Sequence, residues 1–247
     1  MITSKNIPSY VKNAKIEIPM GPIIYGNAVP EKIFSKIEKL AEDTWNRPDR
    51  LDWADELVGH MKHQYYIPHD VLKEYGIYDF LIQSCWWYVF TVEYNQDESE
   101  DSENYNQRQK GFNLKNLVID LEAVWINYQE QGEYNPTHNH GQSNISGVIH
   151  IKDAVKGDSG RKNMKDSTLT LFGGHSPIGM YDRSTMTVPC VPRQFLMWPS
   201  QMLHQVNPFF GEGQRISMAF NYVSWYKHNP GNYHTPKSYS DGPAQTD

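Results

Sequence analysis

The chain has little cysteine and no excess of positive charge. Only Cys85 and Cys190 are cysteines among its 247 residues, and each lies in an apolar run. Two isolated thiols cannot form the disulfide framework of a small secreted domain, so we expect buried free cysteines and a reducing compartment. The formal net charge is -6. Because nucleic acids and anionic lipids are bound by clustered lysine and arginine, the sequence makes no strong case for either partner.

Long hydrophobic runs are also missing. The start, Met1–Asn6, contains no apolar stretch typical of a secretory signal peptide, and the longest apolar run, around Trp86–Val92, is far too short to span a bilayer. We therefore expect a soluble, cytoplasmic protein with no membrane contact, whose partner is a small molecule or a peptide. A chain of 247 residues is long enough for a substantial core, and we expect one elaborated domain.

Residues 1–116 are predicted to form a helical support region. Apolar residues follow Pro30 at helical spacing, and a second helical pattern runs from about His69 to Phe90. Residues 94–111 then change to asparagine, glutamine, serine and acid, which is typical of a solvated loop. We expect the helices to buttress one side of the sheets that follow.

From residue 117 the pattern changes to the two-residue period of β-strands. One face of the first long strand is expected to carry alternate residues, namely Leu117, Ile119, Leu121, Ala123, Trp125 and Asn127. Further short strands, separated by turn residues, follow within residues 117–226 and predict a mainly β sandwich or barrel. Residues 227–247 lose the apolar rhythm, and we expect a polar C-terminal tail.

Three histidines indicate a chemistry. His138 and His140 are two positions apart, so in an extended segment both rings point to one side and can bind one metal ion. Such a pair also occurs by chance in polar loops. His204 follows a predicted turn, from which the chain can return it to the first pair. Three imidazoles leave part of an iron coordination shell open for substrate and oxygen.

The next predicted strand carries a carboxylate-binding pattern. Arg215 and Ser217 share one face of this strand with Ala219 and Asn221. Arginine donates a planar pair of hydrogen bonds and serine donates a third, so together they can hold a carboxylate. The alternative is an ordinary surface arginine on a barrel strand. The short distance along the chain from His204 favours the carboxylate site.

These motifs together resemble a known family. They are Trp125-Ile126-Asn127, His138-Asn139-His140, Ser146-Gly147-Val148, Leu203-His204-Gln205-Val206 and Arg215-Ile216-Ser217-Met218-Ala219-Phe220-Asn221. The pattern is similar to the 2-oxoglutarate- and Fe(II)-dependent oxygenases of the prolyl-hydroxylase-like superfamily, in particular to an H-x-H branch found in phages and marine bacteria. The resemblance covers about residues 117–222, which is under half of the chain.

The resemblance implies a double-stranded β-helix, a jelly roll similar to the cupin fold, whose open end holds Fe(II). It implies that His138 and His204 are iron ligands and that Arg215 with Ser217 binds the far carboxylate of 2-oxoglutarate. Asn127 is similar to an asparagine that some relatives use for this cosubstrate, although a strand-end residue that caps a turn is the alternative. The implied reaction uses O2 to hydroxylate an unidentified substrate, such as a peptidyl or free amino acid, while 2-oxoglutarate is decarboxylated to succinate.

The sequence departs from the family pattern at His140, where most members have aspartate or glutamate. A neutral imidazole leaves one more positive charge on the iron centre, so whether His140 is a ligand depends on the structure. His150 is interpreted as a hydrogen-bonded core or rim residue, with a place in the cosubstrate pocket as the alternative.

Two other functions fit the same sequence. A three-histidine cupin-type oxygenase without 2-oxoglutarate needs no carboxylate-binding arginine, and a non-catalytic jelly-roll binding module needs no open metal position. A structural zinc site requires a fourth ligand, for which no cysteine or histidine stands ready in the sequence. The aromatic residues between Tyr222 and Tyr226 leave a homodimer open.

Overall fold

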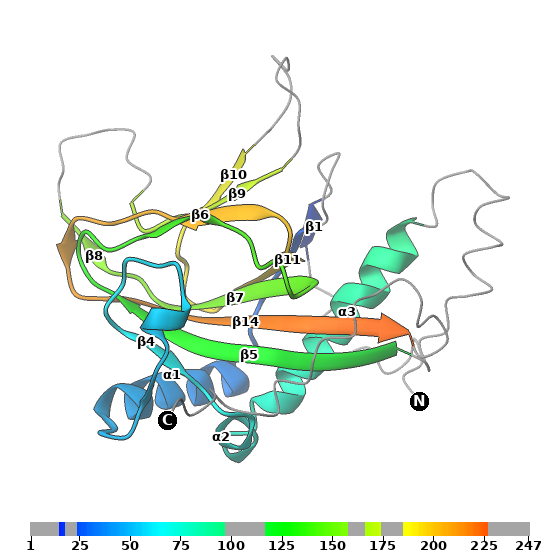
Figure 1. The fold of residues 1–247 in the computed structure, drawn as a ribbon, viewed down its shortest axis with the longest axis horizontal. Coiled ribbons are helices and arrows are strands. Elements are labelled where there is room, and N and C mark those ends of the chain that lie inside the picture. The colour runs from blue at the N-terminus through cyan, green and yellow to red at the C-terminus, as the bar shows by residue number, and fades with distance from the viewer. Residues whose placement is uncertain (1–14, 18–23, 97–116, 158–165, 174–184, 227–247) are drawn as a thin grey trace, which may run out of the picture.

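A computed structural model describes residues 15–17, 24–96, 117–157, 166–173 and 185–226 of the chain. Over these residues two antiparallel sheets face each other, and helices lie on the far side of the larger sheet (Figure 1). The acidic loop expected at 94–111 lies outside the described residues, apart from residues 94–96, which end a helix. The tail expected at 227–247 lies outside them entirely.

The larger sheet has eight strands. In spatial order they are β1 (Lys15–Glu17), β2 (Ile24–Ala28), β11 (Gln194–Pro199), β7 (Ile145–Lys152), β14 (Arg215–Tyr226), β5 (Leu117–Gln129), β4 (Gln64–Tyr66) and β3 (Leu51–Asp52). The long strand β14 lies inside the sheet, because β5 pairs with it on one side and β7 on the other. The region of residues 1–116, expected to be helical, therefore also supplies short strands to both edges of this sheet.

The smaller sheet has four strands. Their order is β10 (Thr185–Val188), β9 (Leu169–Phe172), β12 (Leu203–Val206) and β6 (Asn135–His138). A separate two-stranded ribbon joins β8 (Val155–Lys156) to β13 (Gly211–Glu212). Apolar side chains of both sheets fill the space between them, among them Leu171 and Val188 of the smaller sheet and Leu196 of the larger. The mainly β jelly roll expected from the sequence is confirmed.

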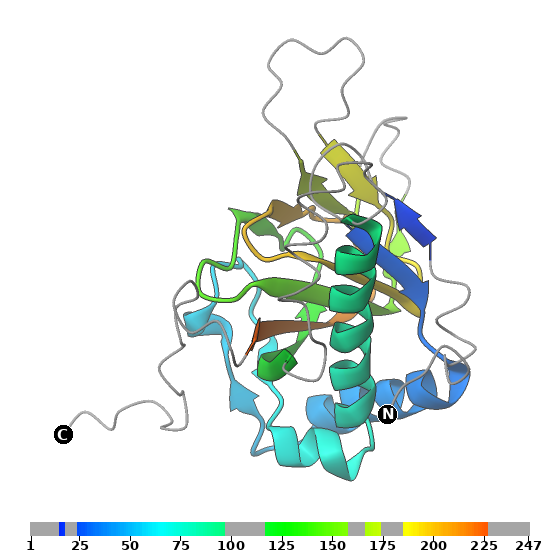
Figure 2. The same cartoon turned by 90° about the vertical axis from the view of Figure 1, so that its right-hand side faces the viewer.

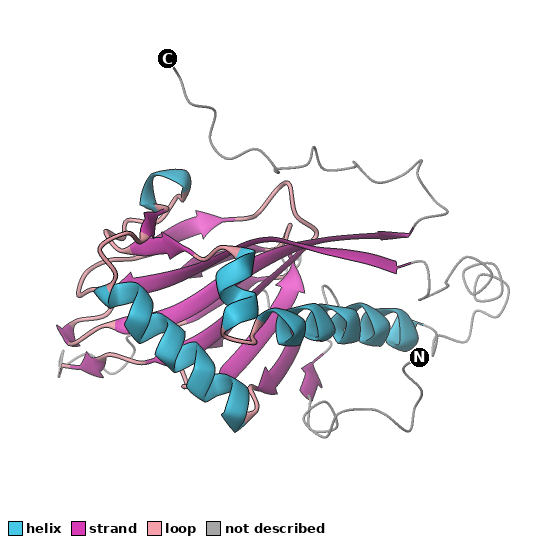
Figure 3. Ribbon diagram, turned by 90° about the horizontal axis from the view of Figure 1, so that it is seen from below, coloured by secondary structure: helices cyan, strands magenta, loops and turns pink. Residues whose placement is uncertain are grey.

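Within the described residues, three α-helices and one 3-10 turn lie outside the sheets. They are α1 (Glu31–Asn46), α2 (His69–Glu74), α3 (Tyr78–Gln96) and the 3-10 turn Ala54–Glu56. Figure 3 shows the α-helices against one side of the strands, and Figure 2 shows the long α3 upright in front of the two sheets. Helix α1 buries Phe34, Ile37 and Leu40, which fall on one helical stripe. The second helical pattern is two helices because Gly76, with a φ of 63°, turns the chain between them.

The two faces of the larger sheet have different environments, and the alternation along β14 is the one predicted. Met218 and Phe220 belong to the core that packs against the helices, whereas Ser217 and Ala219 line the space between the sheets. Tyr222 is also buried, and its hydroxyl donates a hydrogen bond to the carbonyl of Leu81 in α3 (2.8 Å). Tyr222 is therefore a core residue, and its ring is not available for contact with a second subunit.

The prediction that every second residue of β5 lies on one face is wrong, because the pattern changes at Glu122. Ala123 pairs with Asn221 of β14, and Leu121 pairs with Tyr222, the residue after Asn221. Glu122 lies between Ala123 and Leu121 and has no partner in β14, so it is the extra residue of a β-bulge. Because one extra residue reverses the alternation, Leu121 packs in the core on the helix side while Trp125 lines the space between the sheets. Trp125 and Asn127 thereby reach the interior of the jelly roll.

Both cysteines are buried free thiols, as expected. Among the helices that the structure describes, none combines the length and the apolar character that a membrane span requires.

Candidate active site

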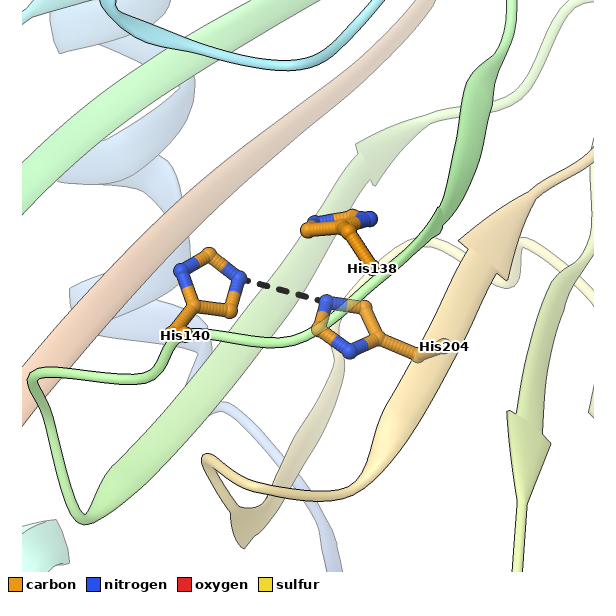
Figure 4. A group of neighbouring side chains, drawn as sticks. All are labelled: His138, His140 and His204. Carbon is orange, nitrogen blue, oxygen red and sulfur yellow. Dashed lines mark hydrogen bonds between the residues drawn. The ribbon is translucent and has the colours of Figure 1, made fainter.

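Three histidines from the smaller sheet and the turn after it meet in one place (Figure 4). His138 is the last residue of β6 and lies directly opposite His204 of β12, so the two rings share a face, with centroids 4.2 Å apart. His140 lies beyond the end of β6, and its Nε2 atom is 3.3 Å from Nε2 of His204. One ligand atom of each ring lies within 4.8 Å of the other two. The structure thus brings together the three histidines singled out in the sequence.

The hydrogen bonds of two of these rings direct one nitrogen toward the cluster. Nδ1 of His138 donates to the carbonyl of Pro136 (2.8 Å), and Nδ1 of His204 donates to the carbonyl of Met202 (3.0 Å). A carbonyl only accepts hydrogen bonds, so the proton stays on Nδ1 and the lone pair of Nε2 is available. This is the tautomer that a metal bound at Nε2 requires.

Burial keeps the cluster uncharged. Loss of solvent, followed by repulsion between the neighbouring imidazoles, lowers the pKa of His140 to about 4 and that of His204 to about 3. Burial also lowers the pKa of His138. Neutral imidazole is the form that binds metal, so at neutral pH metal binding requires no net loss of protons from these rings.

The histidine cluster offers a metal ion three ligands, which leaves other coordination positions free. Within the described part of the chain, no further histidine, cysteine or carboxylate joins the three histidines. A structural zinc site has four protein ligands, whereas a catalytic metal keeps positions for exogenous ligands. The three imidazoles line a pocket, which matches the second kind of site.

Arg215 is a buried cation without a carboxylate partner. Its side chain is 1 % exposed, and among the described residues none supplies an ion pair to it. Its Nη1 atom lies 3.3 Å from Oγ of Ser217 and 3.5 Å from Oε1 of Gln129, and its Nε atom has no partner within the described chain. An uncompensated buried charge costs several kcal/mol, so this end of the pocket is complementary to an anion. The far carboxylate of 2-oxoglutarate fits that requirement.

A row of polar residues crosses the sheet beside Arg215. Ser217 lies directly opposite Asn127 of β5 on one side and His150 of β7 on the other. Asn127 lines the pocket, and its Oδ1 accepts a hydrogen bond from Nε2 of Gln64 (2.7 Å). His150 is fully buried, pairs through Nδ1 with Oε1 of Gln194 (3.0 Å), and does not line the pocket.

Three further residues lie at or beside the site, and the sequence predicted no specific role for them. Gln129 lies opposite Arg215, which only the register of β5 and β14 reveals. Trp198 lines the pocket next to His204, and its buried Nε1 atom has no partner among the described residues. Asn221 contacts His140 through its side-chain amide. Its position on the same face as Ser217 was the signal that pointed to it.

Residues 123–221 match the model of a family described as "Putative 2OG-Fe(II) oxygenase". No curated protein matches the chain. The matched residues include all three histidines, Asn127, Arg215 and Ser217.

Three of the solved structures that match this chain are of enzymes. The α-ketoglutarate-dependent epimerase SnoN from nogalamycin biosynthesis is 10% identical, with a TM-score of 0.51 over 92% of this chain and 86% of that one. The carbocyclase SnoK from the same biosynthesis is 10% identical, with a TM-score of 0.49 over 93% and 91%. A prolyl-4-hydroxylase from Pseudomonas putida is 14% identical, with a TM-score of 0.45 over 82% and 91%.

At these identities, the likeness to SnoN shows the fold. The family match covers the strands that carry the histidines and the buried arginine. Over residues 123–221, which are under half of its length, the chain is therefore similar to the 2OG-Fe(II) oxygenases, which are oxidoreductases that use Fe(II) and 2-oxoglutarate.

Proposed function

We propose that the protein is a dioxygenase that hydroxylates a C–H bond of a small-molecule or peptidyl substrate, with a free or peptidyl amino acid as the first class to test. The observation that carries the proposal is that the three-histidine cluster lines the same pocket as Arg215, which has no carboxylate partner among the described residues. Residues 117–226 form the oxygenase core in this proposal, and residues 1–116 support it.

His138, His140 and His204 would hold Fe(II) through their Nε2 atoms. The carbonyls of Pro136 and Met202 support this assignment, because they keep the Nδ1 protons of His138 and His204 in place. When bound, iron with 2-oxoglutarate and O2 supplies the oxidising power, and 2-oxoglutarate leaves as succinate and carbon dioxide. The residues of the chain bind and orient the reactants and exclude water from them.

Arg215 and Ser217 would bind the far carboxylate of the cosubstrate. The guanidinium offers a planar pair of N–H donors, and the Ser217 hydroxyl 3.3 Å from it offers one more. Asn127 lies opposite Ser217 and presents its amide to the same pocket. Because β14 is paired on both sides, these groups stand on a rigid element, which suits a site that positions a reactant.

The buried arginine separates this proposal from the two alternatives. A three-histidine oxygenase without 2-oxoglutarate would leave the Arg215 cation in the pocket with no anion to compensate it. A binding module with a structural metal would have a closed coordination shell, whereas this cluster has three ligands among the described residues. Neither alternative gives a role to both features.

The decisive experiment is anaerobic visible spectroscopy of the full chain with Fe(II) and 2-oxoglutarate. We expect the weak charge-transfer band of chelated 2-oxoglutarate in the wild type. His204→Ala should lose the band because it removes a buried ligand, and Arg215→Ala should lose it at cosubstrate concentrations that saturate the wild type. Arg47→Gln is the matched control, because Arg47 is an exposed cation paired with Asp49.

Succinate formation in air provides a second readout. The wild type and Arg47→Gln should form succinate slowly without a substrate, and both site variants should not. If the wild type gives neither the band nor succinate, the dioxygenase proposal is wrong and the binding module is favoured. If it gives iron binding without any effect of 2-oxoglutarate, the three-histidine oxygenase is favoured.

A further inference from the structure

The ring of His140 is held in a different way from the other two rings of the cluster. His138 and His204 donate from Nδ1 to backbone carbonyls, which can only accept. Nδ1 of His140 instead lies 3.0 Å from Nδ2 of Asn221, a side-chain amide. An amide presents a donor on one side and an acceptor on the other, so it does not by itself fix where the proton of His140 lies.

The amide of Asn221 is the first member of a buried chain of hydrogen bonds. Its Oδ1 accepts from Oγ of Ser146 (2.8 Å), and Oγ of Ser146 lies 2.9 Å from Oγ of Ser200. Asn221 is 8% exposed, Ser146 2% and Ser200 0%. Ser200 also anchors the backbone of His140, because its carbonyl accepts a hydrogen bond from the N–H of His140 (3.0 Å).

In this arrangement His140 carries its proton on Nε2. Nδ2 of Asn221 donates to Nδ1, so Nδ1 is the acceptor and a neutral ring must be protonated at Nε2. That proton is directed at the lone pair of Nε2 of His204, 3.3 Å away. The two rings are therefore hydrogen-bonded across the position where the metal would lie.

A metal ion at Nε2 requires the other tautomer of His140, and the chain can supply it. If the amide of Asn221 turns by half a rotation about its Cβ–Cγ bond, Oδ1 accepts from Nδ1–H and Nδ2 donates to Ser146. The hydroxyl of Ser146 then donates to Ser200 instead of to Asn221. Each hydroxyl can both donate and accept, so the hydrogen bonds that join Asn221, Ser146 and Ser200 persist with their directions reversed, and the heavy atoms keep their places.

We propose that Asn221, Ser146 and Ser200 form a reversible hydrogen-bond chain that switches His140 between a metal-free Nε2–H form and a metal-bound Nδ1–H form. Solvent water takes the proton from Nε2 and another is delivered from solvent to Nδ1, so the imidazole stays neutral. Asn221 is then the positioning residue for the third ligand. The inference rests on the proposed function, because it takes the three histidines as the metal site.

Long-range 1H–15N NMR correlations of the imidazoles test the switch directly. In the full-length metal-free protein, His140 should be the Nε2–H tautomer, and Zn(II) should convert it to Nδ1–H. His138 and His204 should remain Nδ1–H in both states. A His140→Gln spectrum assigns the resonances. If His140 has the same tautomer with and without Zn(II), the proposal is wrong.

Co(II) affinity tests the role of Asn221. Asn221→Leu keeps the size of the side chain but removes its hydrogen bonds, and loss of such a partner of a metal-binding histidine lowers affinity by about 10- to 100-fold. Asn221→Asp can only accept from Nδ1–H and adds a negative charge, so it should bind Co(II) more tightly and show Nδ1–H even without metal. Asn207→Leu is the matched control, because it removes a partly buried amide that hydrogen-bonds Thr168 and Thr170 and does not line the pocket.

The outcomes separate this inference from the proposed function. If the wild type binds no Co(II), the metal site itself is wrong. If the wild type binds Co(II) and Asn221→Leu binds equally well, only the role of Asn221 is wrong. Should Asn221→Leu fail to fold, Ser146→Ala breaks the next link while the amide stays in place, and an unchanged affinity and tautomer in that variant would overturn the chain.

Discussion

The guanidinium of Arg215 lies 3.3 Å from the hydroxyl of Ser217 on one face of β14, and both side chains are buried. In the ligand-free protein this contact is the main compensation of a buried cation. We expect Arg215→Met to raise the free energy of unfolding by about 1–3 kcal/mol, because replacing uncompensated buried charge by an apolar side chain is often stabilising. The same variant should lose binding of 2-oxoglutarate.

Urea unfolding of the metal-free protein and calorimetric titration with 2-oxoglutarate in the presence of Mn(II) measure the two effects. Arg47→Met, at an exposed ion pair, should change stability by less than about 1 kcal/mol and leave cosubstrate binding intact. A less stable Arg215→Met protein would show that the guanidinium already has adequate partners, and the argument for an anion site would lose its support.

His140→Asp tests the departure from the usual ligand set. The substitution gives two imidazoles and one carboxylate, the facial triad of non-haem iron oxygenases. An added negative charge in the ligand shell should tighten Fe(II) binding by about tenfold or more, since 1.4 kcal/mol already gives that factor. Equilibrium dialysis under anaerobic conditions measures the affinity. His60→Asp, at an exposed histidine stacked on Tyr134, is the control and should bind iron as the wild type does.

His140→Ala completes this comparison. It should bind Fe(II) more weakly than the wild type. Equal affinity in the wild type, His140→Ala and His140→Asp would mean that His140 is not a ligand.

Gly147→Ala tests the packing between the sheets and the helices. A Cβ atom at Gly147 would contact the ring of Phe220 and would lie 2.8 Å from the carbonyl oxygen of Leu196. Overpacking of this kind costs about 1–3 kcal/mol, and we expect that loss in thermal or urea unfolding. Gly141→Ala is the matched control, because nothing lies within 4 Å of its Cβ position. Equal stability of the two variants would contradict the packing described for β7.

His150→Gln should make the protein less sensitive to acid. Burial, and then the charge of Arg215, lower the pKa of His150 from 6.5 to about 3. Between these values the unfolded chain binds a proton that the folded chain does not, so stability falls as the pH falls, by about 1.4 kcal/mol per pH unit. Glutamine removes this contribution, whereas the other buried histidines keep theirs.

Urea unfolding of the wild type and of His150→Gln at several pH values between 6.5 and 4.5 gives the slopes to compare. The variant should have the shallower slope, by about one proton, and the two stability curves should run parallel above pH 7. Parallel curves over the whole range would mean that His150 is protonated in the folded protein as readily as in the unfolded chain.

The two-residue period of β-strands predicted that Arg215, Ser217 and Asn221, the part of the candidate site on β14, share one face. That strand carries no bulge between Arg215 and Asn221 in its pairing with β5, so residues two apart in sequence share a face in the structure. The same rule was wrong for β5, because the bulge at Glu122 reverses the alternation and nothing in the composition around it indicates an extra residue. The short strands β2 and β4, which lie next to the edge strands of the larger sheet, were missed for a related reason, since a few residues carry too little periodicity to be recognised.

The environment of His140 was beyond sequence reasoning. Its spacing from His138 suggested a common strand, yet His140 lies past the end of β6, and its ring is held by Asn221 and its backbone by Ser200. These partners are far away along the chain and meet it only through the packing of one sheet on the other. The sequence could indicate three candidate ligands but not which of them is held differently.

The histidines belong to the smaller sheet and its turn, whereas Arg215 belongs to the larger sheet. In the proposed enzyme, one cosubstrate molecule therefore reaches from one layer of the jelly roll to the other. The spacing of the layers would then limit the length of a bound diacid, and we expect a diacid one carbon shorter or longer to bind more weakly. Selectivity among 2-oxo diacids would thus be set by the apolar packing between the sheets as much as by the polar groups of the pocket.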